Sequence, residues 1–285
     1  MKRTDFRHTE PLRVRWAEID AQGIVFNGHY LTYLDTAVSG YWRALAIPYT
    51  ATMKSLGGEL YVRRAMLDYR GSARYDDRLD IGIRCREFGN SSMKVDGGIF
   101  HGEQLLVQAE MVYVFADPST QSPAPLPAPL RGLIQDFEAG QPVVDVTLGG
   151  WAELGAEATA IRREVFVEEQ HIPADMEWDS ADASCLHALA RNRFGMALAT
   201  GRLLEHVPGV AKIGRMAVLR AMRGTQIGRQ VLEALMAEAR RQGYREVLLH
   251  AQLAAENFYV RAGFQRRGQP FEEAGIGHVE MVRAL

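Results

Sequence analysis

The chain has 285 residues, of which 33 are basic and 35 acidic, so its formal net charge is −2. This length allows about two domains of ordinary size, and the balanced charge argues against a nucleic-acid partner. No apolar run of about eighteen residues and no signal-peptide pattern occurs, so we expect a cytoplasmic protein with no membrane partner. Cys85 and Cys185 are expected to be reduced side chains, neither a disulfide nor a metal pair.

The first predicted strand covers residues 12–19, where apolar and polar side chains alternate. A loop that contains Asp20 and Gly23 follows, and then an amphipathic helix is predicted over residues 30–46, ended by Pro48. The apolar face of this helix consists of Tyr30, Leu31, Leu34, Val38, Tyr41, Trp42 and Leu45.

Four further strands are predicted after this helix, over residues 58–66, 79–85, 92–100 and 105–115. The last is the clearest, because six apolar side chains alternate strictly along it. A long helix packed against a curled antiparallel sheet is the simplest way to bury these faces.

This order of elements resembles the hotdog-fold acyl-CoA thioesterases of the 4-hydroxybenzoyl-CoA thioesterase type, over roughly residues 12–117. The resemblance implies that Asp20 is catalytic, as a nucleophile or as a general base. It also implies that a backbone N–H near Asn27 or Gly28 polarises the thioester carbonyl. Many relatives have His or Tyr at position 27, so the role predicted for Asn27 is that of its backbone. The alternative is that Asp20 is only a turn or cap residue.

A proline-rich segment marks the seam between two predicted domains, residues 1–140 and 141–285. A short helix over residues 131–137 is expected to close the first domain, and residues 138–142 form the linker. The prolines of this segment are Pro118, Pro123, Pro125, Pro127 and Pro129.

The second domain is predicted to begin with a strand over residues 143–148 and a helix over residues 152–165. Further along, a short apolar run that includes Ile213 and Val218 precedes a turn, residues 223–228, and an amphipathic helix that begins there. Backbone N–H groups and the helix dipole favour an anion at such a turn. A strand over residues 246–251 follows, and then Phe258, Tyr259, Gly263 and Phe264.

These residues resemble the GNAT N-acetyltransferases, whose phosphate turn is matched by Arg223 and Gly228, whereas Gln226 stands where a glycine is usual. Residues 165–170 and 275–281 resemble the ElaA-like branch of that family. The resemblance implies that Tyr259 protonates the departing thiolate of coenzyme A; the alternative is a buried core tyrosine. It also implies these contacts to the coenzyme: Met216, Val218, Arg223, Gly224, Thr225, Gln226, Ile227, Gly228 and Asn257.

The fold class predicted is therefore α+β, with a hotdog domain followed by a GNAT domain. The first hypothesis is a bifunctional enzyme that hydrolyses an acyl-CoA and transfers acetyl from acetyl-CoA to an amine not yet identified, with Glu169 and His278 as candidate bases. The alternative is a single-activity thioesterase whose second domain is a coenzyme A sensor or assembly module. The hotdog resemblance implies a homo-oligomer, and no metal is predicted.

Overall fold

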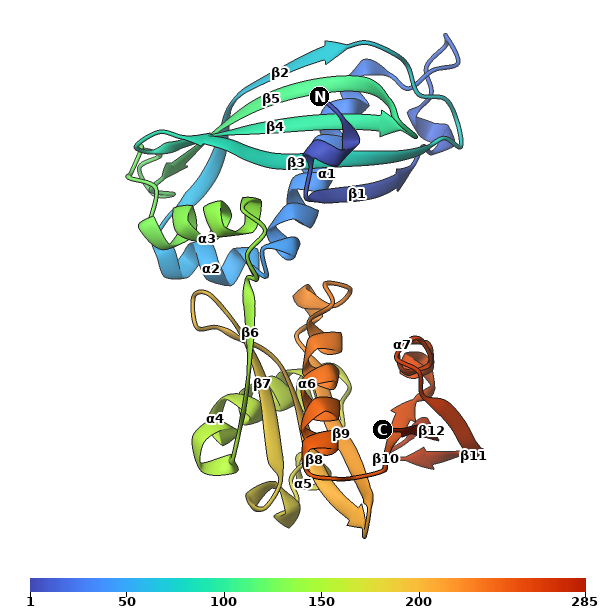
Figure 1. Cartoon of the computed structure of the whole chain (residues 1–285). Helices are drawn as coiled ribbons and strands as arrows, with labels where there is room; N and C mark the ends of the chain where they lie inside the picture. Colours follow the sequence, from blue (N-terminus) through green and yellow to red (C-terminus); the bar gives the residue numbers. More distant parts are fainter. The chain divides into compact units, whose positions relative to one another are not determined.

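The computed structural model describes residues 1–285, which divide into two compact units, Met1–Val143 and Val144–Leu285 (Figure 1). Each unit has its own sheet, with five strands in the first and seven in the second. This mixture of helix and sheet confirms the predicted α+β class with two domains. None of the helices combines the length and the apolar character that a membrane span requires. Cys85 and Cys185 are buried and unpaired.

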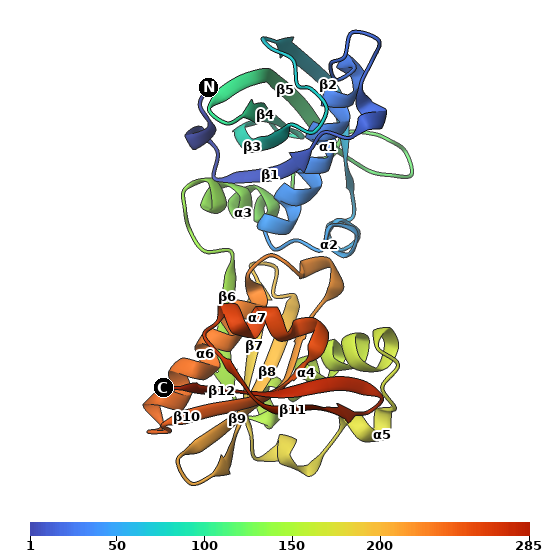
Figure 2. The same cartoon turned by 90° about the vertical axis from the view of Figure 1, so that its right-hand side faces the viewer.

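The first unit is an antiparallel sheet with strand order β1-β3-β4-β5-β2. Its long helix α1 (Asn27–Ala44) packs against β1, β3 and β4 (Figure 2). The alternation predicted for the last strand is confirmed, because Val107, Ala109 and Met111 are all buried. The strands are β1 (His8–Arg13), β2 (Glu59–Tyr69), β3 (Arg78–Phe88), β4 (Ser92–His101) and β5 (Gln104–Ala116).

The strand predicted over residues 12–19 is wrong for most of its length. Strand β1 ends at Arg13, and Trp16–Glu18 form a short 3-10 helix in which Trp16 is 78% exposed. The helix ends at Ala44 instead of residue 46, because Ala46 has a left-handed φ of 56° that an α-helix cannot continue. The predicted apolar face is otherwise buried, except for Leu31, which is exposed.

Two shorter helices complete the first unit, α2 (Tyr49–Leu56) and α3 (Ala128–Glu138). Helix α3 begins three residues before the predicted start at 131, because Pro129 lies in its first turn, where a missing N–H costs no helical bond. Helix α2 was not predicted; Pro48, expected only to stop the preceding helix, is the N-cap of α2.

The second unit has a seven-stranded sheet with order β11-β12-β10-β9-β8-β7-β6. Only β9 and β10 are parallel neighbours. The strands are β6 (Val144–Gly149), β7 (Leu186–Asn192), β8 (Ala197–Val207), β9 (Val210–Val218), β10 (Glu246–Gln252), β11 (Gln265–Glu273) and β12 (Ile276–Ala284). The helices are α4 (Trp151–Arg162), the π-helical segment Arg163–Glu169, α5 (Ala174–Glu177), α6 (Ile227–Arg241) and α7 (Glu256–Arg261).

Strands β9 and β10 separate soon after they begin. They pair only where Val210, Ala211 and Lys212 face residues 246–248, and β9 then continues to Val218 away from its neighbour. A bulge opposite Gly201 bends β9 at Arg215, whose φ is 52°. The far half of β9 therefore has backbone N–H and C=O groups with no sheet partner on the β10 side.

Candidate functional sites

Asp20 lies in a tight loop directly before α1. Its carbonyl accepts a hydrogen bond from the Gly23 N–H at 3.0 Å, and its own N–H donates to the Ile24 carbonyl at 2.9 Å. Carboxylate oxygen Oδ1 accepts from the Gln22 N–H at 2.8 Å, whereas Oδ2 has no hydrogen-bond partner. Asp20 is only half-buried, so one oxygen shapes the turn and the other is free for chemistry.

Glu18 anchors this loop to α1, and the sequence reasoning missed it. Its buried carboxylate accepts a hydrogen bond from the Tyr33 hydroxyl at 2.6 Å and from the Arg15 backbone N–H at 2.7 Å. Burial acts to raise the pKa of Glu18, but these bonds to Tyr33 and Arg15 outweigh it and lower the pKa. The Glu18 carbonyl also accepts from the Phe26 N–H at 2.9 Å, which fixes the start of the helix.

Asn27 and Gly28 are the first two residues of α1 and both are exposed. Their N–H groups lie in the first turn, where a helix offers no internal acceptor. The Asn27 carbonyl accepts a hydrogen bond from the Tyr69 hydroxyl at 3.2 Å, so the helix start meets the end of β2. An antiparallel bridge between Ile19 and Val25 closes the loop between Asp20 and this helix start.

In the second unit, a cleft of about 610 Å³ runs beside the separated half of β9. The predicted coenzyme contacts that line it are Met216, Val218, Arg223, Gly224, Gln226 and Gly228. Three other predicted contacts do not line it. Ile227 is buried in the core, Asn257 is exposed, and the Thr225 hydroxyl donates to the Met222 carbonyl at 2.5 Å.

The turn before α6 has the backbone shape that the predicted phosphate site needs. Gly224 and Gln226 both have left-handed φ angles, 82° and 69°. Gln226 adopts this conformation although a side chain there costs about 1–2 kcal/mol, which explains why glycine suits the position. A Cβ on Gly228 would lie 3.1 Å from Val218 Cγ2, so glycine lets α6 approach β9 closely.

Arg223 is held by an acidic partner from a distant part of the chain. Its two terminal nitrogens donate to the two carboxylate oxygens of Glu169 at 2.7 and 2.6 Å, and its Nε donates to the Val218 carbonyl at 3.2 Å. The arginine lowers the pKa of Glu169. This carboxylate lines neither the cleft nor the neighbouring cavity, which weakens Glu169 as a candidate base.

A second cavity, of about 360 Å³, opens from the inner end of the cleft. The two spaces share five lining residues: Gln170, Met216, Gln252, Ala255 and Tyr259. Burial raises the pKa of Tyr259, and its hydroxyl has no hydrogen-bond partner. Beside it, the Gln252 amide donates to the Gln170 side-chain oxygen at 2.8 Å, so a hydrogen-bonded amide pair lies at the junction.

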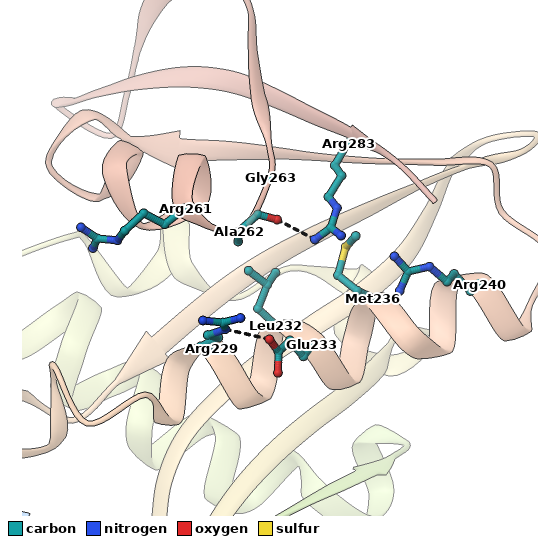
Figure 3. Close-up of a pocket in the computed structure, with 9 residues that line it drawn as sticks. All are labelled: Arg229, Leu232, Glu233, Met236, Arg240, Arg261, Ala262, Gly263 and Arg283. Atoms are coloured by element: carbon teal, nitrogen blue, oxygen red, sulfur yellow. Dashed lines mark hydrogen bonds and ion pairs between the residues drawn. The ribbon is translucent and has the colours of Figure 1, made fainter.

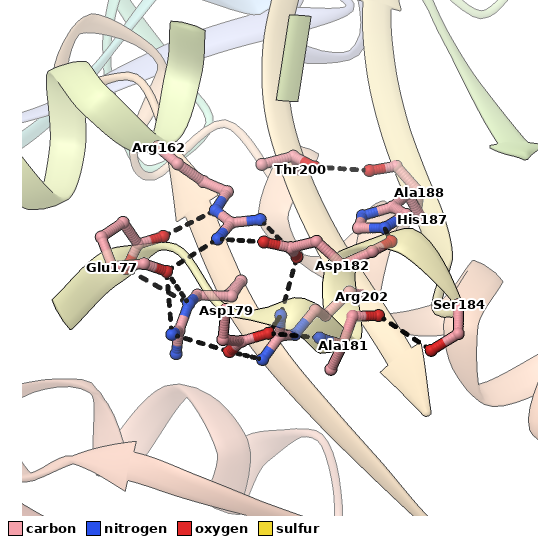
Figure 4. Close-up of polar contacts among 11 residues, drawn as sticks. Arg162, Glu177, Asp179, Ala181, Asp182, Ser184, His187, Ala188, Thr200 and Arg202 are labelled. Carbon is pink, nitrogen blue, oxygen red and sulfur yellow. Dashed lines mark hydrogen bonds and ion pairs between the residues drawn. The ribbon is translucent and has the colours of Figure 1, made fainter. Parts of the chain in front are cut away.

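A network of arginines and carboxylates lies beside the second cavity (Figure 4), and three of its members, Glu177, Asp179 and Arg202, line that cavity. Arg162 is 1% exposed and binds Glu177 at 2.6 Å and Asp182 at 2.8 Å. Arg202 binds Asp179 at 2.6 Å and Asp182 at 2.7 Å. Each buried charge thus has an opposite partner, and the network joins α4 and α5 to β8.

We expect this network to make the second unit sensitive to acid. Hydrogen bonds from Arg202 lower the pKa of Asp179 to about 2, below its value of about 4 in an unfolded chain. The folded state therefore binds this proton less readily, so the stabilisation is present above pH about 4 and is lost as pH falls towards about 2. Calorimetry of the full chain should show an unfolding midpoint that falls over this range.

The Asp179→Asn variant should show a weaker dependence on pH over that range and a lower midpoint at neutral pH. Asp145→Asn is the matched control, because Asp145 is an exposed aspartate of the same unit. Equal pH dependence in the Asp179 variant and the unaltered chain would contradict the assignment.

His250 is a candidate base that the sequence reasoning missed. It lines the second cavity on β10, with Nδ1 3.5 Å from Lys212 Nζ and 3.3 Å from Glu273 Oε2. Burial, followed by Lys212, lowers the pKa of His250, so the imidazole is neutral at pH 7. His278 also lines the cavity, and its Nδ1 lies 2.8 Å from the Ile276 carbonyl. The sequence did offer one sign of such a role, because His250 is a polar side chain between Leu249 and Ala251 in the predicted strand.

No three His, Cys, Asp or Glu side chains are grouped so that they could hold a metal ion. The candidate groups are a carboxylate beside a helix start in the first unit and, in the second, a turn with left-handed backbone before α6, a tyrosine and a polar cavity.

Comparison with known proteins gives a match for each unit. A family model described as the thioesterase superfamily matches residues 22–108, and one described as an acetyltransferase (GNAT) domain matches residues 154–285. The uncharacterized protein YyaT of Bacillus subtilis (strain 168) is 34% identical over 132 residues, which are 45% of this chain and 88% of YyaT.

A further relative and a solved structure are similar to parts of the chain. The uncharacterized N-acetyltransferase YjcF of the same strain is 30% identical over 128 residues, 45% of this chain and 90% of YjcF. The crystal structure of Slr0204, a 1,4-dihydroxy-2-naphthoyl-CoA thioesterase from Synechocystis, is 23% identical, covering 46% of this chain and 96% of that chain with a TM-score of 0.42.

Proposed function

We propose that the chain, whose second domain belongs to the GNAT acetyltransferases and whose first domain matches the thioesterase superfamily over residues 22–108, is a bifunctional enzyme of coenzyme A thioesters. The first domain hydrolyses an acyl-CoA, and the second transfers acetyl from acetyl-CoA to an amine. The observation that carries the proposal is the cleft that runs from the phosphate turn to Tyr259 and there meets a second, polar cavity.

In the second domain, the pyrophosphate occupies the turn at the start of α6, where Gly224 and Gly228 let the ligand approach the backbone. The pantetheine arm pairs with the free backbone groups of β9 between Met216 and Val218. This arrangement places the thioester at the junction beside Tyr259. The amine occupies the second cavity, on the other side of the junction.

The transfer then requires two proton movements. The amine nitrogen attacks the acetyl carbonyl carbon, and the carbon–sulfur bond breaks. A base accepts the proton that the amine loses; His250 is our candidate, since it is neutral at pH 7 and lines the cavity. The Tyr259 hydroxyl gives a proton to the departing sulfur. Burial favours the neutral form of this hydroxyl, which has no competing hydrogen-bond partner in the chain.

In the first domain, the thioester carbonyl lies over the start of α1, where the N–H groups of Asn27 and Gly28 stabilise the developing oxyanion. Asp20 either attacks the carbonyl carbon, which expels the thiolate and leaves an anhydride that water then hydrolyses, or takes a proton through Oδ2 from a water that attacks the carbonyl carbon itself. Both routes release coenzyme A and the free acid. The Glu18–Tyr33 hydrogen bond at 2.6 Å holds the Asp20 loop against α1.

A second candidate function keeps the first domain catalytic and makes the second a coenzyme A sensor or assembly module. The bidentate pair between Arg223 and Glu169 favours it, because the arginine of the turn is already neutralised within the chain. Calorimetry with acetyl-CoA and an acetylation assay over a panel of amines separate the two. Acetylation of any amine supports the bifunctional enzyme, whereas binding without product supports the sensor.

We also propose that the first domain forms a homo-oligomer through β2. This strand is an edge of the sheet and pairs only with β5, which leaves a row of free backbone groups. Its exposed apolar side chains are Tyr61, Val62, Met66 and Tyr69. Because Tyr69 also binds the Asn27 carbonyl, a second copy on this edge would lie close to the proposed oxyanion site.

The Met66→Lys variant should weaken this self-association about tenfold or more, because a buried charge without a partner is costly at an interface. Light scattering after size-exclusion chromatography over a range of concentrations measures the mass. Val207→Lys is the control, since Val207 is similarly exposed but lies in the second domain. A mass that is unchanged in the Met66 variant would contradict the proposal.

A further inference from the structure

Lys212 is the only lysine of the second unit, which also contains sixteen arginines. The groove between α6, the end of α7 and β12 shows the contrast, because all its cations are arginines (Figure 3): Arg229, Arg240, Arg261 and Arg283. A guanidinium stays protonated in proteins and is therefore no nucleophile, whereas a buried lysine readily loses its proton. The one basic side chain of this unit that can accept an acyl group is therefore Lys212.

Lys212 lines the second cavity from β9, at the last residue of that strand that pairs with β10. Its side chain is half-buried, and Nζ lies 3.5 Å from His250 Nδ1. The other two cations of the cavity, Arg202 and Arg215, are both bound by Asp179, at 2.6 and 3.2 Å. Lys212 belongs to none of the ion pairs of the structure, which extend to 4.0 Å. No salt bridge therefore holds this lysine in its protonated form.

The position of Nζ is the one that the proposed transfer requires of an acceptor amine. A base must lie within hydrogen-bonding reach of the proton it accepts, and this reach is often looser before a ligand binds. His250 is the candidate base, and its Nδ1 also lies 3.3 Å from Glu273 Oε2. This carboxylate stabilises the imidazolium that forms when His250 accepts a proton. An amine, a base and a carboxylate thus lie in sequence within one chain.

Resting on the proposed function, we infer that Lys212 is an acetyl acceptor, so that the second domain acetylates its own chain at this residue. The ammonium form first loses one proton to solvent, and burial favours this loss because it lowers the pKa of Lys212. Neutral Nζ then attacks the acetyl carbonyl carbon at the junction beside Tyr259, the nitrogen–carbon bond forms and the carbon–sulfur bond breaks. Nζ gives its second proton to His250 Nδ1, and Tyr259 gives one to the sulfur. Both groups recover their protonation states from solvent, and the products are acetyl-lysine and free coenzyme A.

The test is mass spectrometry of the full chain after incubation with acetyl-CoA, on the intact protein and then on its proteolytic peptides. We expect one acetyl group on Lys212, added about 100-fold faster than on Lys54, which is exposed on the first unit and has no base of the cavity beside it. Lys212→Arg, which keeps the charge, should remove this acetyl group, and Lys54→Arg should not. His250→Gln should slow the acetylation of Lys212 about 100-fold and leave that of Lys54 unchanged.

Two results would overturn the inference without touching the proposed function. One is transfer of acetyl to an amine of the panel with no acetyl on Lys212. The other is acetylation of Lys212 and Lys54 at equal rates, which would make the modification a reaction of acetyl-CoA in free solution. Absence of acetyl from the chain and from every amine of the panel would overturn the proposed transfer, and the inference with it.

Discussion

Replacing Asp20 with Asn is expected to lower acyl-CoA hydrolysis about 100- to 10,000-fold, the range lost with a catalytic acid or base. Acetyl transfer should be unaffected, because Asp20 belongs to the first unit. An amide cannot accept the proton of an attacking water, and it is a poor nucleophile. Release of free thiol from a panel of acyl-CoA substrates, followed with a thiol reagent, measures the loss.

The substitution separates chemistry from structure, because an Asn side-chain oxygen can still accept the hydrogen bond that Oδ1 accepts from the Gln22 N–H. Asp117→Asn is the matched control. Asp117 forms the same kind of turn, with Oδ1 2.7 Å from the Ser119 N–H, in the same unit. Hydrolysis at the normal rate in the Asp20 variant would leave Asp20 as a turn residue only.

The spacing of apolar residues predicted correctly those strands and helices whose buried face follows from their own sequence. The alternating side chains of β5 and the helical repeat of α6 each place an apolar face in the core. The strand expected over residues 12–19 failed because a contact distant in sequence decides its conformation. Glu18 binds Tyr33, fifteen residues away, and this bond stabilises a 3-10 turn where the alternation predicted a strand.

The same distinction applies to the second site. The shape of the turn before α6 was predictable, because its glycines and the helix after it are consecutive in the chain. The second cavity was not, since Arg202, Lys212 and His250 come from three strands that only the sheet brings together. Glu169 was a reasonable candidate base in the sequence, but its partner Arg223 lies 54 residues away. Spacing along the chain cannot show such a contact.

Replacing Tyr259 with Phe is expected to lower the rate of acetyl transfer about 100-fold, because it removes the proton donor to the departing thiolate. The ring should keep its place, since its edge-to-face contacts with Phe258 and Phe264, at centroid distances of 4.9 and 6.0 Å, do not involve the hydroxyl. The affinity for acetyl-CoA, measured by calorimetry, should therefore be unchanged. A fall in kcat without a change in binding is the expected signature.

The pH profile adds a second readout. Burial raises the pKa of Tyr259 above its ordinary value, so the hydroxyl should remain a proton donor throughout the neutral and mildly alkaline range. Transfer by the unaltered chain should then show no loss from tyrosine ionisation below pH about 10. Tyr244→Phe is the control, because Tyr244 belongs to the same unit and lines neither cavity. An unchanged kcat in the Tyr259 variant would mean that solvent protonates the thiolate, and Tyr259 would then be a core residue.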